Sequence, residues 1–160
     1  MATNARLVGI ISDTHGLLRS GVHEALAGVD VILHAGDVGG DEILSELGLI
    51  APVKAVFGNT DPPGTPSLEE SLRLAIDGVT IHVSHGHEIG TPTPVKLAEA
   101  YPEADVIIYG HTHRQLVTRI GERLIINPGA AGPRRFRLRP SLGRMTISGG
   151  KAEVEIIDLA

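Results

Sequence analysis

Residues 7–15 read LVGIISDTH, an apolar run that ends in an aspartate and a histidine. A continuous apolar run without polar alternation predicts a strand that is buried on both faces. Two similar runs follow, VILHAGD at 31–37 and VKAVFGN at 53–59, and each ends in a glycine and a polar residue. Apolar residues at helical spacing fill the segments between the runs. This alternation predicts parallel strands with helices packed on the sheet.

The second half of the chain is rich in hairpin signals. Apolar segments at 72–76 and 79–83 flank Asp77-Gly78, segments at 116–120 and 123–126 flank Gly121-Glu122, and segments at 144–147 and 152–157 flank Gly149-Gly150. Such dipeptides favour tight turns between antiparallel strands. A helix is expected over 95–101, with Pro94 in its first turn, and a buried strand over 106–109. We therefore expect one α/β domain over residues 1–160, with two stacked sheets and helices outside.

Composition excludes several classes of protein. The net charge of −5 provides no basic footprint for nucleic acid. The absence of cysteine excludes disulfides, a thiolate nucleophile and a cysteine-ligated zinc site. The first six residues lack the apolar region of a signal peptide, and no apolar run reaches the roughly 18 residues of a membrane helix. We expect a cytoplasmic protein that does not contact membranes.

Five polar clusters stand where the predicted strands end. They are Asp13-Thr14-His15, Gly36-Asp37, Gly58-Asn59-Thr60-Asp61, His85-Gly86-His87 and Gly110-His111-Thr112-His113. Open α/β sheets bind ligands beyond the carboxyl ends of their strands, so we expect these clusters to converge. Carboxylate, amide and imidazole ligands suit Mn, Fe, Zn or Ni, whereas this much histidine is untypical of Mg or Ca. The ligands are too many for one tetrahedral ion and suffice for two.

A pair of metal ions has a definite chemistry. Two ions about 3.5–4 Å apart can clamp the attacking and leaving oxygens of a phosphoryl transfer, and they lower the pKa of a bound water. The attacking group is then a metal-bound hydroxide, so no protein nucleophile is required. This agrees with a chain that has neither cysteine nor a Gly-x-Ser-x-Gly elbow. The clusters therefore predict an enzyme that hydrolyses phosphate esters.

The ordered motifs, together with Asn127-Pro128-Gly129, resemble the calcineurin-like metallophosphoesterase superfamily, and in particular its small bacterial and archaeal branch of YfcE/MJ0936-type phosphodiesterases. The resemblance runs from about residue 6 to residue 135. It implies a four-layer α-β-β-α sandwich of two mixed sheets with helices outside. It also implies hydrolysis of a small phosphate ester, a diester rather than a monoester. The implied cofactors are two divalent ions, with Mn favoured and Ni, Fe or Zn as alternatives.

The resemblance assigns a role to each motif residue. It implies that Asp37 bridges the two ions and that Asn59 also belongs to the catalytic residues. The first ion would be held by Asp13, His15 and His113, and the second by Asn59, His85 and His111. Thr60, near the phosphate, departs from the family pattern, because larger members have a histidine there that assists the leaving group. Water would then protonate the leaving group, or activated esters would be preferred.

Other polar residues receive weaker assignments. Asp61 is expected to orient a ligand through a hydrogen bond, and His87 to approach the substrate, so both join the candidate catalytic residues. Arg134 is a candidate phosphate contact, although the run at 134–139 is better explained as a solvated loop. His34 is expected either to pack inside the protein or to support a ligand residue, and His82 to pack beside its strand. Substrate specificity would lie in loops such as 61–67 and 91–94.

Two other functions compete with the hydrolase. A non-catalytic scaffold for protein binding is one, because the retromer subunit Vps29 resembles this fold and has a degraded metal site. Here every ligand position is filled, which argues against that interpretation. The second is an enzyme resembling metallo-β-lactamases, but residues 114–116 supply no Asp-His pair after His113. The sequence leaves a homo-oligomer open.

Overall fold

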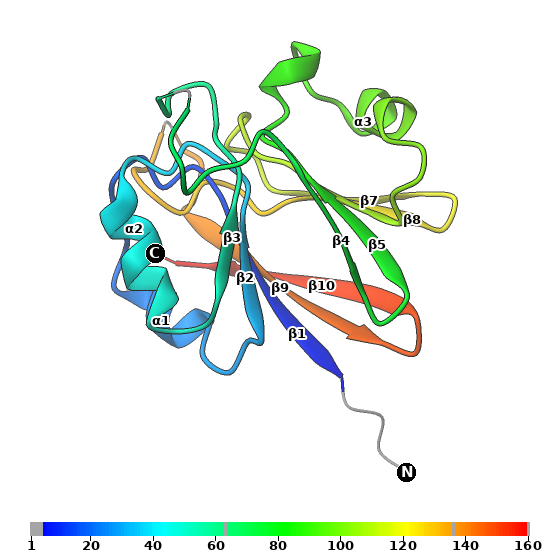
Figure 1. Cartoon of the computed structure of the whole chain (residues 1–160), viewed down its shortest axis with the longest axis horizontal. Helices are drawn as coiled ribbons and strands as arrows, with labels where there is room; N and C mark the ends of the chain where they lie inside the picture. Colours follow the sequence, from blue (N-terminus) through cyan, green and yellow to red (C-terminus); the bar gives the residue numbers. More distant parts are fainter. Residues whose placement is uncertain (1–4, 63, 136, 160) are drawn as a thin grey trace.

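Two five-stranded sheets stack face to face, and helices cover their outer faces (Figure 1). The computed structural model describes residues 5–62, 64–135 and 137–159. The strand order is β10-β9-β1-β2-β3 in the first sheet and β4-β5-β6-β8-β7 in the second. Both sheets mix parallel and antiparallel pairs. The predicted four-layer sandwich is therefore confirmed. The loop expected around Pro63 includes that residue, which lies outside the described ranges.

The first sheet is built around the opening apolar run. Its strands are β1 (Arg6–Ile11), β2 (Val31–His34), β3 (Val53–Ala55), β9 (Ser141–Ser148) and β10 (Lys151–Asp158), and its helices are α1 (Gly21–Ala25) and α2 (Asp41–Gly48). Strand side chains alternate between faces. Val8 and Ile10 of β1 therefore pack between the sheets, while Ile11 packs on the helical side. The continuous run is explained by burial on both faces.

The second sheet repeats this design. It contains β4 (Leu72–Ile76), β5 (Val79–Val83), β6 (Val106–Ile108), β7 (Leu116–Ile120) and β8 (Arg123–Asn127), with the 3₁₀ helix η1 (His87–Ile89) and α3 (Pro94–Ala100) between β5 and β6. Val106 and Ile108 face the other sheet, and Ile107 packs with Leu97 of α3. Each such buried apolar side chain contributes about 1.5–3 kcal/mol. Thr93 caps α3 by accepting from the amide of Lys96.

The predicted elements differ from the structure mainly at their ends. The third strand ends at Ala55, opposite the last residue of β2, His34; the amide of Val56 still donates to His34 O, and the bridge of Val56 and the amide of Phe57 then go to Glu69. The last hairpin is longer than predicted, since β9 and β10 pair from Ser141 to Asp158. Within the described ranges no helix is both long and apolar enough to cross a membrane.

Candidate metal centre

The predicted ligands gather at one edge of the sandwich. β1, β2 and β3 are mutually parallel in one sheet, as are β5 and β6 in the other, so within each sheet the loops after these strands emerge on the same side. Hydrogen bonds join successive loops within each sheet. The amide of Asp13 donates to Gly36 O at 2.9 Å, and the amide of Gly110 donates to His85 O at 3.0 Å. Side-chain contacts then connect the two sheets.

Asp13, His15 and His113 form the first tight group of ligand atoms. Asp13 Oδ1 lies 3.3 Å from His113 Nε2 and 3.7 Å from His15 Nε2. The carboxylate is completely buried, whereas the two imidazoles are slightly exposed. One carboxylate and two imidazoles at these separations form a ligand set for a transition-metal ion.

Asp13, Asp37 and His85 form a second group that shares Asp13 with the first. His85 Nε2 lies 3.2 Å from Asp37 Oδ2 and 3.8 Å from Asp13 Oδ1. Asp37 Oδ2 is also 3.6 Å from His15 Nε2. Two carboxylates therefore stand between imidazoles of both groups, as a pair of neighbouring ions requires.

Asn59 and His111 lie beside this second group but outside both tight sets. His111 Nδ1 is 3.1 Å from Asn59 Oδ1, and the His111 ring packs edge-on against the His85 ring at a centroid distance of 5.2 Å. Both residues are more exposed than Asp13 and His85. All seven predicted ligands are thus brought together, with Asn59 and His111 at the solvent side.

The two carboxylates are held in the same way. Asp13 Oδ2 accepts from Ser12 Oγ at 2.6 Å and from the amide of His111 at 3.2 Å, while Asp13 Oδ1 is buried without a hydrogen-bond partner. Asp37 Oδ1 accepts from the amide of Thr60 at 2.9 Å, and its Oδ2 faces the imidazoles. In each carboxylate one oxygen is fixed by the protein and the other points into the cluster.

The two ring nitrogens of His85 also differ: one is fixed by the protein and the other points into the cluster. Its Nδ1 donates to Ala35 O at 2.8 Å, which leaves the lone pair on Nε2. That Nε2 is buried and has no hydrogen-bond partner. Unpaired buried polar atoms cost about 1–3 kcal/mol each, so they need a reason. A divalent cation between these atoms supplies one, and the donor set fits it.

Backbone strain is concentrated in the same residues. A positive φ is unfavourable for a residue with a Cβ, and it persists where the surrounding structure enforces it. Besides Asp77 in a hairpin turn, the described non-glycine residues with positive φ are five predicted ligands: Asp13, His15, Asp37, His111 and His113. The strain points independently to a functional role for these residues.

Mutual electrostatics keep the carboxylates ionised. Burial alone would raise the pKa of Asp13, but contacts with His113, His15 and His85 hold that pKa far below its usual range. Burial is likewise overcome at Asp37, where His85 lowers the pKa to about 2. Burial would lower the pKa of His85, yet the two carboxylates raise it. The cluster therefore carries fixed negative charge to attract cations.

Several residues position the ligand loops without joining the cluster. Asp61 accepts from the amides of Val38, Gly39 and Gly58 at 2.9–3.1 Å, so it ties the loop after β2 to the loop after β3 and touches no ligand side chain. His34, which was expected to pack inside or to support a ligand residue, accepts from the amide of Gly36 and contacts Thr14 Oγ1 at 3.0 Å.

Sequence reasoning missed the contribution of Ser12 and Thr14. The Ser12 hydroxyl donates to Asp13, and the Thr14 hydroxyl donates to Val38 O at 2.7 Å in the next loop. Asn127, noted only as part of a motif, donates to Gly110 O at 3.1 Å and holds the loop of His111 and His113. Their only signal in the sequence is that small polar residues adjoin buried strands.

The family model of the calcineurin-like phosphoesterase superfamily domain matches residues 7–150 of this chain. The chain belongs to this superfamily. A probable metallophosphoesterase of Methanothermobacter thermautotrophicus is 33% identical over 94% of this chain and 91% of its own length. The phosphodiesterase MJ0936 of Methanocaldococcus jannaschii is 27% identical over 76% of this chain and 82% of its own length. Vacuolar protein sorting 29 of Cryptosporidium parvum shares the fold, with a TM-score of 0.80, 23% identity and 98% coverage of both chains.

Of three further predicted residues, Thr60 and His87 adjoin the cluster. Thr60 is exposed and its amide donates to Asp37 Oδ1 at 2.9 Å. The ring centroid of His87 lies 5.4 Å from that of His85 and 6.4 Å from that of His111. Arg134 is exposed, and among the described side chains no hydrogen bond or ion pair joins it to the ligands.

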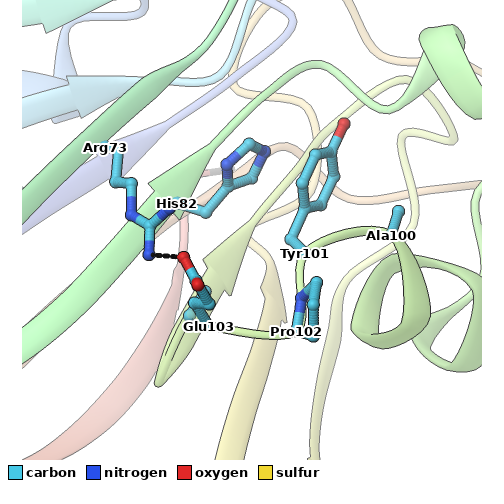
Figure 2. Close-up of a pocket in the computed structure, with 7 residues that line it drawn as sticks. Arg73, His82, Ala100, Tyr101, Pro102 and Glu103 are labelled. Atoms are coloured by element: carbon cyan, nitrogen blue, oxygen red, sulfur yellow. Dashed lines mark hydrogen bonds and ion pairs between the residues drawn. The ribbon is translucent and has the colours of Figure 1, made fainter.

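A second buried histidine of the phosphoesterase domain, His82, lies outside the candidate metal centre. His82 of β5 lines a pocket of about 320 Å³ with Arg73, Tyr101 and Glu103 (Figure 2). Its ring stacks on Tyr101 at a centroid distance of 3.6 Å, and its Nε2 contacts Ser84 Oγ. Burial lowers the pKa of His82 to about 4. His82 therefore packs against Tyr101, as its position in a strand predicted, and its lowered pKa favours the neutral ring.

Proposed function

We propose that this phosphoesterase is a dinuclear metal-dependent enzyme that hydrolyses phosphodiesters. The observation that carries the proposal is the pair of buried carboxylates, Asp13 and Asp37, each with one oxygen turned toward imidazoles of two adjoining groups. In this proposal Asp37, whose Oδ2 lies 3.2 Å from His85 Nε2 and 3.6 Å from His15 Nε2, would be shared by the two ions. Asp13, His15 and His113 would hold one ion, and Asn59, His85 and His111 would hold the other.

The cofactors are two divalent transition-metal ions, with Mn favoured by the family resemblance. When bound, they neutralise charge on the phosphate and lower the pKa of a water molecule, so that hydroxide is available near neutral pH. The chain holds the reacting groups in place. Ser12 and the amide of Thr60 fix the carboxylates, and the Ala35 carbonyl fixes the His85 tautomer. Such preorganisation removes much of the reorganisation cost of the reaction.

His87 is our candidate for the leaving-group acid that Thr60 cannot supply. Its side chain is 29% exposed, and its ring stands between Phe57 and the rings of His85 and His111. A histidine at the solvent side of the ligands can give a proton to the departing oxygen and regain one from water. General acid catalysis of this kind contributes about 10²–10⁴-fold.

The first test is reconstitution of the metal-free protein with Mn, Ni, Zn or Fe. Calorimetric titration should show two ions bound per chain, and the loaded protein should hydrolyse bis(p-nitrophenyl) phosphate faster than p-nitrophenyl phosphate. A faster monoester reaction would overturn the diester assignment. Failure to hydrolyse either ester or any member of a wider diester panel, with both ions bound, would overturn the enzymatic proposal.

The role of His87 is tested by varying the leaving group. His87→Asn should slow esters with alkyl leaving groups by about a hundredfold and esters with p-nitrophenolate far less, because p-nitrophenolate leaves without protonation. The amount of metal bound should not change. An equal loss for both leaving groups would instead indicate a structural role for His87.

A protein-binding scaffold is the second candidate, favoured by the similarity to vacuolar protein sorting 29. A scaffold gives no reason for buried ligand atoms without partners or for strained ligand residues. Stable binding of a protein partner by metal-free chain, together with inactivity under every metal tested, would favour it over the hydrolase.

A further inference from the structure

A basic pocket adjoins the metal centre at His113. The cavity, of about 500 Å³, has His113 in its wall together with Arg114, Arg137, Arg139 and Asp158. We call it the arginine pocket. Arg114 follows His113 directly, Arg137 and Arg139 lie between β8 and β9, and Asp158 ends β10. The pocket therefore lies where the two sheets meet, and one candidate metal ligand forms part of its wall.

The loop that supplies Arg137 and Arg139 is fastened to the ligand loop after β1. The amides of Ala131 and Gly132 donate to Ser12 O at 2.9 Å and Asp13 O at 3.3 Å. Arg19 Nε donates to Gly132 O at 2.9 Å. A Cβ on Gly132 would lie 2.1 Å from Thr14 O, so the approach is close. These contacts keep the start of the arginine-bearing loop at the edge of the metal centre.

The charge of the pocket is unusual for this chain. Three arginines and one carboxylate line it, in a protein whose net charge is −5. Asp158 is already engaged, since its Oδ2 lies 3.6 Å from Arg139 Nη1 and its Oδ1 accepts from Gln115 at 2.9 Å. In the described part of the chain Arg114 and Arg137 form no ion pair. Like charges gathered without partners repel, and an anionic ligand would relieve that repulsion.

We propose that the arginine pocket binds a second anionic group of the substrate, a phosphate carried on one arm of the scissile diester. This inference rests on the proposed function and specifies its substrate class. Guanidinium groups bind phosphate through paired, charge-assisted hydrogen bonds. The cavity is large enough for a sugar phosphate as well as a phosphate group. Because His113 belongs both to the ligand cluster and to the wall of the pocket, we place the second phosphate about one sugar away from the scissile phosphate.

A matched pair of substrates tests this proposal. Thymidine 5′-(p-nitrophenyl phosphate) and its 3′-phosphorylated form share the scissile bond and differ only in the second phosphate. Wild-type protein should show about tenfold higher kcat/KM for the 3′-phosphorylated form, as expected for charge-assisted contacts. Arg114→Gln combined with Arg137→Gln should abolish this preference, so that the two substrates give equal kcat/KM. Arg135→Gln is the matched control, because Arg135 is exposed on the same loop and is not among the residues that line the pocket.

Equilibrium binding separates this proposal from the enzymatic one. Metal-free protein should bind thymidine 3′,5′-bisphosphate about tenfold more tightly than thymidine 5′-monophosphate, and the double variant should lose the difference. If binding shows this preference but neither ester is hydrolysed, the proposed hydrolysis fails and the pocket stands. If the esters are hydrolysed without preference for the second phosphate, or if Arg135→Gln removes the preference equally, the pocket assignment is overturned.

Discussion

His82 lies within strand β5 and His85 lies just after its end, and the two histidines have opposite environments. His85 turns an unpartnered Nε2 toward two buried carboxylates, which raise its pKa. His82, three residues earlier, stacks on Tyr101, and burial lowers its pKa to about 4. Both histidines are buried. The difference shows that burial alone does not mark a candidate metal ligand; what distinguishes His85 is a ring nitrogen without a hydrogen-bond partner beside two carboxylates.

The largest expected effect is the loss of a carboxylate from the cluster. Asp37→Asn should lower kcat/KM by about a thousandfold or more, because a neutral amide replaces the charge shared by the two ions. Metal titration should show fewer than two ions per chain. His82→Gln is the control and should keep both ions and a rate close to wild type. Similar losses in both variants would erase the distinction between the two histidine sites.

A smaller effect is expected from the glycines that permit close approach. A Cβ on Gly58 would lie 2.1 Å from Asp37 Oδ1, so Gly58→Ala should displace that carboxylate. We expect a loss of about tenfold to a hundredfold in kcat/KM, since such displacements strongly affect catalysis. Gly48→Ala, at a glycine with no neighbour within 4 Å of the added carbon, should leave activity unchanged. A Gly58→Ala protein with wild-type kinetics would contradict this account.

The pH dependence of stability gives a third test of the comparison. The folded-state pKa values of His34 and His82 are lowered from 6.5 to about 4, so below pH 6.5 the unfolded chain binds protons that the folded chain does not. The contribution of these two histidines to the free energy of unfolding is complete above pH 6.5. It is lost as pH falls toward 4, by about 1.4 kcal/mol per pH unit for each group. Urea unfolding of metal-free protein between pH 7.5 and 4.5 measures this loss of stability.

The raised pKa of His85 makes its own contribution to stability change with pH in the opposite direction. A variant of His82 is therefore needed to isolate the effect of that residue. His82→Gln should have a shallower loss of stability below pH 6.5 than wild type, because one depressed histidine has been removed. Identical pH profiles would show that His82 titrates in the folded protein as it does in the unfolded chain.

The smallest expected effect lies in the pocket of Figure 2. Tyr101 donates to Glu88 Oε2 at 2.7 Å, and Glu88 Oε1 accepts from the amide of Gly86, next to His85. Tyr101→Phe should cost about 1 kcal/mol of stability, the usual value of one hydrogen bond. Hydrolysis should be nearly unchanged, because the carboxylates are untouched. A large loss of activity would show that this pocket influences the metal centre.

Much of the architecture was predictable from local pattern. Strands buried on both faces are continuous apolar runs, and the runs at 7–12, 31–35 and 106–109 predicted β1, β2 and β6 for that reason, to within one residue at each end. The turn at Asp77-Gly78 was also recognised, and both residues adopt positive φ there. The end of β3 was not predictable, because Val56 and Phe57 are apolar and continue the run, whereas their pairing with the distant Glu69 is a tertiary contact.

The candidate ligands were also identified from sequence, but their arrangement was not. Residue types and the position of each cluster after a strand identify Asp13, Asp37 and His85, because such side chains bind metals and parallel strands end together. Which carboxylate oxygen is fixed and which is free depends on Ser12, Thr60 and the amide of His111, and these contacts join residues up to 98 positions apart.

The sequence by itself determined the alternation of buried strands and helices, the chemistry of the ligands and the family resemblance, since these follow from local order. The tertiary structure alone decided that Asp61 ties two backbone loops together, that Tyr101 is the partner on which His82 stacks, and that Arg114 and Arg137 line one pocket with His113. The physical reason is that pairing, burial and charge depend on which distant segments the folded sheets bring into contact.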